Sequence, residues 1–169
     1  MKRPDSSEFA PYYSGYISLA ADDVIGQLAG QTDEIRSTID GLPEDKGRFA
    51  YADGKWTIKE VLSHLIDGER IFSYRILRIS RGDETPIEGF EQDVYIENSN
   101  ANNRSFADLL DEFDRQRQAD LLMIKNIDDQ GLDRMGTASG NPVSVRALVF
   151  ISAGHVEHHL RILKERYLT

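Results

Sequence analysis

Residues 56–67 read Trp-Thr-Ile-Lys-Glu-Val-Leu-Ser-His-Leu-Ile-Asp, and this stretch contains the clearest helix start in the chain. Thr57 and Glu60 have the spacing of a capping box, in which each side chain accepts a hydrogen bond from the backbone N–H of the other residue. Apolar residues then recur every three or four positions as far as Gly82. The pattern predicts a long amphipathic helix that begins after Thr57 and ends near Gly82.

Three further segments have helical periodicity. The first runs from Ser14 to Ile39 and should end at Gly41-Leu42-Pro43, because glycine suits a helix C-terminus and proline cannot continue a helix. Another begins near Ser105 and ends before Gly131. The last opens at Asn141-Pro142, an N-cap followed by proline at the first helical position, and runs to about Tyr167. No segment carries a convincing strand signal.

Four helices of this length predict an all-α fold, a four-helix bundle, in a single domain that comprises residues 1–169. The connections are longer than a simple up-down bundle requires. The longest connection comprises residues 81–104. Loops of more than about 15 residues usually either cross the bundle or cover a site. Two alternatives are open for this connection: an ordered lid, or a flexible surface loop.

Composition limits the function classes. The chain is 40% hydrophobic and 29% charged, with a net charge of −9, so nucleic acid is not an expected partner. It has no cysteine, which excludes disulfides, thiolate zinc sites and a cysteine nucleophile. Neither a signal peptide nor an apolar run long enough to span a membrane is visible, so we expect a cytoplasmic protein without a membrane partner.

The histidines are the candidate metal ligands. His155 and His159 are four residues apart, on one helical face, and they fall on the apolar stripe that includes Leu148 and Ile162. His64 lies in the apolar half of the second predicted helix. Imidazoles on facing helices commonly build metal sites in bundles, and three of them leave coordination positions open for catalysis. The alternative is a hydrogen-bonded core histidine beside a chance pair.

Other metal architectures do not fit. A metalloprotease helix needs Glu directly after the first histidine, where this chain has Val156. Carboxylate-bridged di-iron bundles need two E-x-x-H motifs, which neither histidine segment offers. Among carboxylates, Asp67 is a weak catalytic candidate that could orient a ligand ring, but it could equally be a solvated partner of Arg70. Glu157 is expected on the surface.

Two further groups have open roles. His158 lies on the flank of the last predicted helix, where it could shuttle protons, or be exposed, or lie in a dimer contact. Tyr12, Tyr13 and Tyr16 precede or begin the first predicted helix. They could line the mouth of a pocket, but an aromatic N-terminal arm packed on the bundle is the simpler interpretation.

Two motifs carry a family resemblance. The run from Trp56 to Asp67 resembles the W-[ST]-x-x-E-x-x-x-H-L-x-D signature of the DinB-like (YfiT-like) superfamily, and residues 154–159 resemble its closing G-H-x-x-x-H. The resemblance implies a four-helix bundle with crossover connections, often dimeric, so a homodimer is expected. It also implies a site for one divalent metal, zinc or nickel, formed by His64, His155 and His159.

Members of that superfamily are described as metal-dependent hydrolases, and relatives include transferases and isomerases that use low-molecular-weight thiols such as bacillithiol or mycothiol. The resemblance therefore implies a small-molecule substrate and either a thiol S-transferase or a hydrolase. Because the chain has no cysteine, a thiol would have to come from a cosubstrate. The alternative is a non-catalytic metal-binding domain that acts in stress response or in an interaction.

Overall fold

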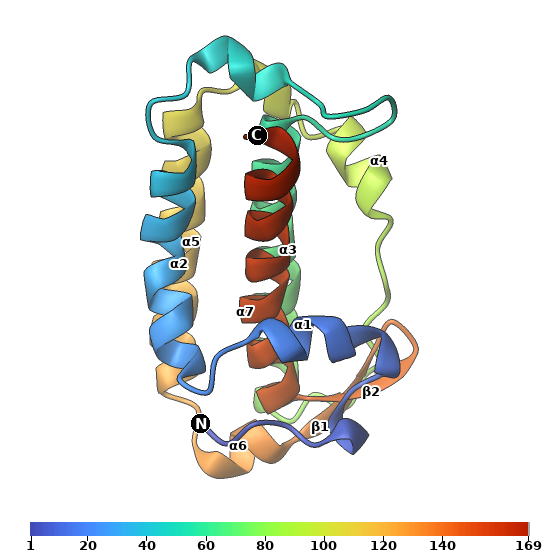
Figure 1. The fold of residues 1–169 in the computed structure, drawn as a ribbon. Helices are drawn as coiled ribbons and strands as arrows, with labels where there is room; N and C mark the ends of the chain where they lie inside the picture. Colours follow the sequence, from blue (N-terminus) through green and yellow to red (C-terminus); the bar gives the residue numbers. More distant parts are fainter. Residues whose placement is uncertain (169) are drawn as a thin grey trace.

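The computed structural model describes residues 1–168 and is built on four long helices, which lie lengthwise beside one another (Figure 1). They are α2 (Val24–Ile39), α3 (Ile58–Ser80), α5 (Phe106–Lys125) and α7 (Val145–Ile162). Both α2 and α3 pack against α5 and α7, so the order around the bundle is α2, α5, α3, α7. The connections from α2 to α3 and from α5 to α7 therefore join diagonal helices. The predicted four-helix bundle with crossover connections is confirmed.

The direction of the helices explains the longest connection. In Figure 1, α3 and α5 run the same way, so the chain must return along the bundle between them. A helix as long as α3, with 23 residues, spans about 35 Å, which a short loop cannot cross. The returning segment contains α4 (Gln92–Glu97), which packs on α3. It also pairs with the rest of the chain, since Ile87 N donates to Thr137 O (2.9 Å). Of the two alternatives for residues 81–104, the ordered one is observed.

The predicted start of α3 is confirmed. Thr57 Oγ1 accepts a hydrogen bond from Glu60 N (3.2 Å), and Glu60 Oε2 accepts one from Thr57 N (2.8 Å). The other carboxylate oxygen of Glu60 accepts from Asn102 Nδ2 (2.8 Å), in a short 3₁₀ turn before α5. The capping box therefore also fixes the end of the long connection against α3. The 3₁₀ turns of the chain are Ser6–Glu8, Pro11–Tyr13, Glu44–Arg48 and Ala101–Asn103.

The prediction of one helix from Ser14 to Ile39 is wrong. The chain forms α1 (Ser14–Leu19), turns at extended Ala20, and restarts as α2 with Asp23 as N-cap, whose side chain accepts from Gly26 N (3.1 Å). The short α1 packs on α7, across the lower part of the bundle in Figure 1. A separate cap was available at Asp23, and the tertiary contact with α7 fixes α1 in a different direction.

The prediction for the third helix is confirmed, and the prediction for the start of the fourth needs correction. The third was expected to begin near Ser105 and to end before Gly131; Ser105 caps α5, which ends at Lys125, and Gly131 lies in a separate short helix, α6 (Asp129–Asp133). The fourth was expected to begin at Asn141-Pro142, but Ser144 caps α7, with its hydroxyl accepting from Ala147 N (2.9 Å). The last helical turn, Leu163–Tyr167, is a π-helix.

Asn141 instead begins a strand, so the expectation of no strands is wrong as well. Strands β1 (Met135–Ala138) and β2 (Asn141–Ser144) form an antiparallel hairpin in which Ala138 pairs with Asn141. The two-residue turn, Ser139-Gly140, has positive φ at both positions (51° and 75°), as the tight primed hairpin turns require.

A buried polar network joins all four long helices. Arg117 on α5 donates to Glu69 on α3 (2.7 Å) and to Gln31 on α2 (2.9 Å). The other oxygen of Glu69 accepts from Ser152 on α7 (2.7 Å), and Gln31 donates to Ala153 O on α7 (2.8 Å). Since the side chains of Arg117 and Glu69 are only 2% and 3% exposed, these bonds form inside the core. The network fixes the relative positions of the helices below the candidate site.

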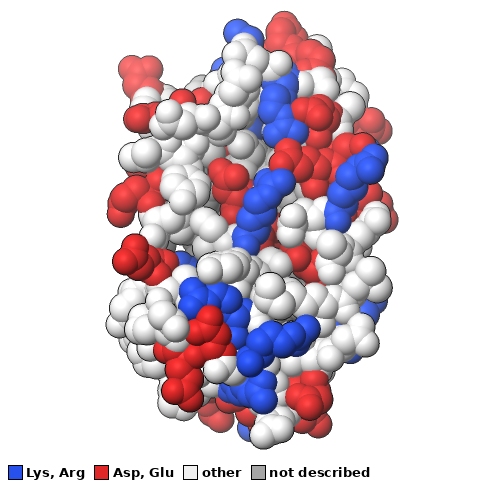
Figure 2. Space-filling model, turned by 180° about the vertical axis from the view of Figure 1, so that it is seen from behind, with Lys and Arg blue, Asp and Glu red and all other residues white. Residues whose placement is uncertain are grey.

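The surface carries charged side chains of both signs. On the face shown in Figure 2, Lys and Arg side chains lie among Asp and Glu side chains, and several basic side chains gather in the lower half. Ion pairs of the protein include Arg104 with Glu112 (2.5 Å). Among residues 1–168, no helix is both long enough and apolar enough to cross a bilayer.

Candidate metal centre

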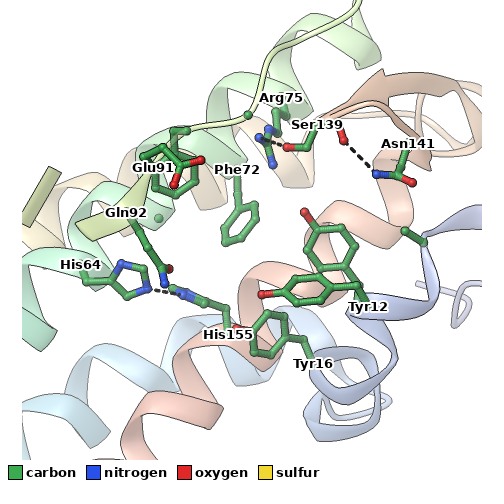
Figure 3. A pocket seen from close by; sticks show the side chains of 15 residues that line it. Tyr12, Tyr16, His64, Phe72, Arg75, Glu91, Gln92, Ser139, Asn141 and His155 are labelled. Carbon is green, nitrogen blue, oxygen red and sulfur yellow. Dashed lines mark hydrogen bonds between the residues drawn. The ribbon is translucent and has the colours of Figure 1, made fainter. Parts of the chain in front are cut away.

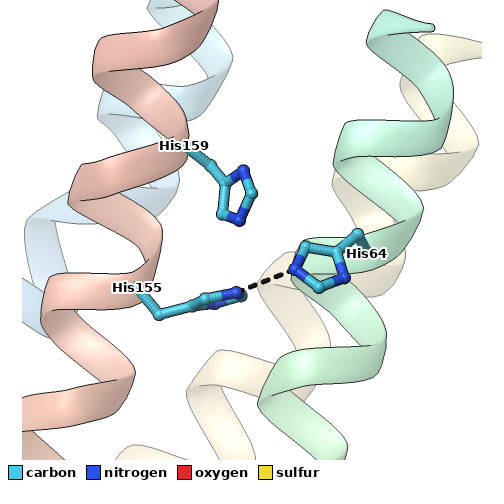
Figure 4. A group of neighbouring side chains, drawn as sticks. All are labelled: His64, His155 and His159. Carbon is cyan, nitrogen blue, oxygen red and sulfur yellow. Dashed lines mark hydrogen bonds between the residues drawn. The ribbon is translucent and has the colours of Figure 1, made fainter. Parts of the chain in front are cut away.

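The three predicted histidines meet in the core between α3 and α7 (Figure 4). The ring of His64 lies 4.8 Å from that of His155 and 4.7 Å from that of His159, and the last two rings are 4.7 Å apart, all measured between centroids. The rings therefore form a nearly equilateral triangle. Nε2 of His64 faces Nε2 of His155 at 2.9 Å. All three residues are buried, with 3%, 5% and 9% exposure.

The close packing of the His155 ring against α3 depends on a glycine. Gly68 is four residues after His64 on α3, and the imidazole of His155 packs directly on its backbone: a Cβ at Gly68 would lie 2.9 Å from Cε1 of His155. Because any side chain at this position would occupy the space of the ring, the close approach of α7 to α3 requires glycine here.

Aromatic rings surround the triad. Trp56 lies 4.7 Å from His64, and Phe72 and Tyr16 each lie 5.5 Å from His155. The last helical turn also holds Trp56 in place, since the Tyr167 hydroxyl donates a hydrogen bond to the backbone carbonyl of Trp56 (2.7 Å). These rings keep bulk water away from most of the triad.

Burial keeps the three imidazoles neutral. It lowers the pKa of His64 to about 4, although nearby Asp93 opposes the shift. Burial also moves the pKa values of His155 and His159 well below the usual range, and the neighbouring histidines add to the shift. Since metals bind the neutral form of imidazole, the ligands need not release protons at neutral pH.

The donor set fits a divalent metal ion. One ring nitrogen of each histidine lies within 4.8 Å of the others. Imidazole is a common ligand of zinc, nickel and other transition metals, and three neutral rings leave the ion's remaining coordination positions for other ligands. Buried imidazoles grouped without a carboxylate or a thiolate could therefore hold one divalent cation.

A cavity of about 440 Å³ opens beside the triad (Figure 3). His64 and His155 line it at one end, and Arg75 and Ser139 line it elsewhere. The long connection contributes Gln92 to its wall, so this segment does cover the site. The lining residues from the N-terminal arm are Ala10, Tyr12, Tyr13 and Tyr16.

A second cavity, of about 310 Å³, also borders the triad. His159, Trp56 and Asp93 line it, and Gln92 borders both cavities. The triad therefore borders two cavities, which share the first residue of α4 in their walls.

Asp67, the weak catalytic candidate, is not part of this arrangement. It lines a different cavity, together with Arg70, Arg104 and Glu112, and burial raises the pKa of its carboxyl. No hydrogen bond joins Asp67 to a histidine within residues 1–168. This position favours the alternative interpretation, a carboxylate near Arg70.

The residues next to the triad lie partly at the cavity and partly towards the surface. The ring of His158 is half-buried and lies 5.4 Å from that of Tyr16, outside the triad. Glu157 is half-buried rather than fully on the surface, and it forms an ion pair with Arg161 (3.0 Å). Tyr12, Tyr13 and Tyr16 fit both of their proposed roles. The N-terminal arm packs on the bundle, and the tyrosine rings also line the cavity of about 440 Å³.

Sequence reasoning missed several residues of the site. Gly68, Phe72 and Arg75 follow His64 at spacings of four, four and three, so they extend the same face of α3 along the cavity. That periodicity was available in the sequence. The contribution of Gln92 was not, because it depends on the path of the long connection.

We expect Gly68→Ala to weaken metal binding at least tenfold, because the new methyl group displaces the imidazole of His155 from the triad. Titration of the chelator-treated protein with zinc, followed by calorimetry, measures the effect. Gly30→Ala is the matched control, since Gly30 also lies in a long helix and has open space around its Cβ position. Equal zinc affinity in the two variants would contradict this role for Gly68.

The neutral triad also predicts a pH dependence of stability. The pKa of His64 is lower in the folded protein than its usual value of 6.5, so its contribution to stability is complete above about pH 6.5 and is lost as the pH falls towards 4. This lowering of the pKa of His64 should reduce the free energy of unfolding by about 2 kcal/mol between pH 6.5 and pH 5.

Urea unfolding of metal-free protein at these two pH values should show this loss. A His64→Gln variant should lose less stability over the same interval, since it lacks the titrating ring. The same pH dependence in both proteins would show that His64 titrates normally.

Comparisons with known proteins agree with this architecture. A family model described as the DinB superfamily matches residues 27–163. The structure is similar to that of YfiT from Bacillus subtilis, described as a probable metal-dependent hydrolase with an unusual four-helix bundle topology. The TM-score is 0.80 and the sequence identity 16%, over 96% of this chain and 89% of the YfiT chain. The search of curated proteins found no match. Since the family model spans most of the sequence, including all three histidines of the triad, the chain belongs to the DinB superfamily.

Proposed function

We propose that this protein is a metal-dependent enzyme that acts on a small molecule, with one divalent ion, zinc or nickel, held by His64, His155 and His159. The observation that carries the proposal is a buried triad of neutral imidazoles beside an open cavity of about 440 Å³. A purely structural metal site closes its coordination sphere with protein ligands, and residues 1–168 provide no fourth His, Cys, Asp or Glu ligand at the triad. The arrangement therefore favours catalysis over the non-catalytic alternative.

The ion supplies a Lewis acid that lowers the pKa of a coordinated water or thiol. The protein's own residues do the rest. Trp56 and Phe72 exclude water from the triad, which strengthens electrostatic interactions within it. Burial raises the pKa of the Tyr16 hydroxyl to about 12, so it remains protonated at neutral pH and can donate a hydrogen bond. Because Tyr16 lines the cavity and its ring lies 5.5 Å from that of His155, we propose that it stabilises negative charge developing on a substrate there.

The two cavities support a reaction with two substrates. A thiol S-transferase must bring an electrophile and a thiol cosubstrate to one ion. His155 lines one cavity and His159 lines the other, so each substrate could approach the ion through its own cavity. A hydrolase needs one organic substrate and water. We therefore place the thiol S-transferase first and the hydrolase, the class in which YfiT is described as a probable member, second.

The test follows the loss of an electrophile in the presence of zinc-loaded or nickel-loaded protein. Cysteine, glutathione, bacillithiol and mycothiol are each supplied as the thiol, and model esters and amides without a thiol test hydrolysis. We expect thiol-dependent conjugation that chelation abolishes. Loss that needs no thiol would assign a hydrolase, and rates equal to the uncatalysed reaction with every compound would contradict both activities.

A further inference from the structure

Three arginines are buried in this bundle, and they differ in how their charge is compensated. Arg117 pairs with Glu69 and Arg146 pairs with Asp133. Arg75 on α3 is just as buried, with 2% exposure, but none of the ion pairs among residues 1–168 includes it.

The hydrogen bonds of Arg75 are few and neutral. Its Nη2 donates to Ser139 Oγ (2.9 Å) and, at 3.4 Å, to the carbonyl of Glu88. Its Nε is buried and has no hydrogen-bond partner within residues 1–168. A buried guanidinium without a carboxylate is costly, because the desolvation of the charge is not offset by an opposite charge.

The position of Arg75 beside the cavity suggests why an unpaired charge is kept there. Its side chain lines the same cavity as His64 and His155, on the same face of α3 (Figure 3). The α-carbons of His64 and Arg75 are about 16 Å apart along the helix, and helical side chains lean towards the N-terminus, here towards the triad. The ring of Phe72 lies between them on this face. The cavity therefore has a metal-ligating end, an apolar middle and a cationic end.

We propose that Arg75 binds the carboxylate of the substrate, and that the substrate is a small carboxylic acid with an apolar body that packs on Phe72. Arginine matches the planar carboxylate through two parallel hydrogen bonds, and the buried Nε–H, which has no partner within residues 1–168, is a donor that a carboxylate reaching the guanidinium would satisfy. The carboxylate at Arg75 directs the opposite end of the molecule towards the triad. Glu91 also lines the cavity, but it is exposed and forms no ion pair with Arg75. The identity of the substrate class rests on the proposed function, whereas anion binding by Arg75 does not.

The experiment measures the binding of 3-phenylpropionate by calorimetry, to chelator-treated protein so that no metal contributes. Its neutral amide, 3-phenylpropionamide, and 2-phenylethyl phosphate are the comparison probes. We expect the carboxylate to bind at least about tenfold more tightly than the amide, because a charged hydrogen bond is lost with the amide. In Arg75→Met this preference should disappear, and Arg75→Lys should retain part of it.

Thermal stability and metal content separate binding from a structural role. Because Arg75 is an unpaired buried charge, Arg75→Met should unfold at the same temperature as the wild type or higher, and it should bind zinc equally. A lower unfolding temperature with unchanged carboxylate affinity would overturn the proposal and make Arg75 structural.

The probes give two further results that would overturn it. Equal affinity for the acid and the amide shows that the site does not recognise the charge. Tighter Arg75-dependent binding of the phosphate than of the carboxylate assigns the cationic end to a phosphate ester instead. If the protein shows the expected carboxylate binding but no metal binding, then the proposed function fails while the assignment of Arg75 stands.

Discussion

Replacing His155 with alanine is expected to reduce bound zinc or nickel from about one ion per chain to a trace. The ring of His155 contacts both other rings of the triad, and its Nε2 faces that of His64 at 2.9 Å. With only three protein ligands, loss of one should weaken binding by at least about a hundredfold. Helix content should be retained, because the buried apolar side chains of the bundle remain in place. Elemental analysis of purified protein and circular dichroism measure the two properties.

His158→Ala is the matched control, since it removes an imidazole one position before His159 that lies outside the triad. It should keep the full metal content. If the two variants lose metal to the same extent, or if neither does, the triad is not the metal site.

The second large effect concerns the polar network below the site. Arg117→Met should lower the free energy of unfolding by about 3–5 kcal/mol, because it leaves the carboxylate of Glu69 buried without its charged partner. Urea unfolding at neutral pH measures the change. Metal content reports whether the network also positions His155, which lies three residues after the Glu69 partner Ser152.

A double variant separates the cost of the unpaired charge from the loss of packing. Glu69→Leu combined with Arg117→Met removes both charges, so most of the stability should return. A loss below about 1 kcal/mol in the single variant would contradict this account of the network. So would a double variant that is no more stable than the single one.

Local signals in the sequence predicted the elements that local interactions determine. The start of α3 could be predicted because Thr57 and Glu60 satisfy each other's backbone groups without help from the rest of the chain. The break between α1 and α2 could not be predicted from periodicity, since Ile17 and Val24 are seven residues apart and keep the helical repeat across it. The contact of α1 with α7 decides its direction.

The hairpin was missed for a related reason. Its strands have four residues each, too few for a clear alternation, and Asn141-Pro142 is also a good helix start. The decisive features are Ser139-Gly140, which form the turn, and Ser144, an equally good cap placed three residues later than Asn141.

The candidate site was predictable where it follows helical periodicity. The positions of His64, His155 and His159 on the inner faces of their helices place all three in the core, where the structure brings them together. The cationic end of the cavity was not predicted, because an arginine in an apolar stripe usually has a carboxylate partner. Only the tertiary structure shows that Arg75 has none among the described residues.

The most direct test of the metal centre is a crystal structure of the purified, metal-loaded protein with anomalous data at the absorption edge of the bound metal. We expect a single anomalous peak between α3 and α7, at about 2.0–2.2 Å from a ring nitrogen of each of His64, His155 and His159. A peak coordinated by surface carboxylates, or a triad whose rings bind only one another, would contradict the account.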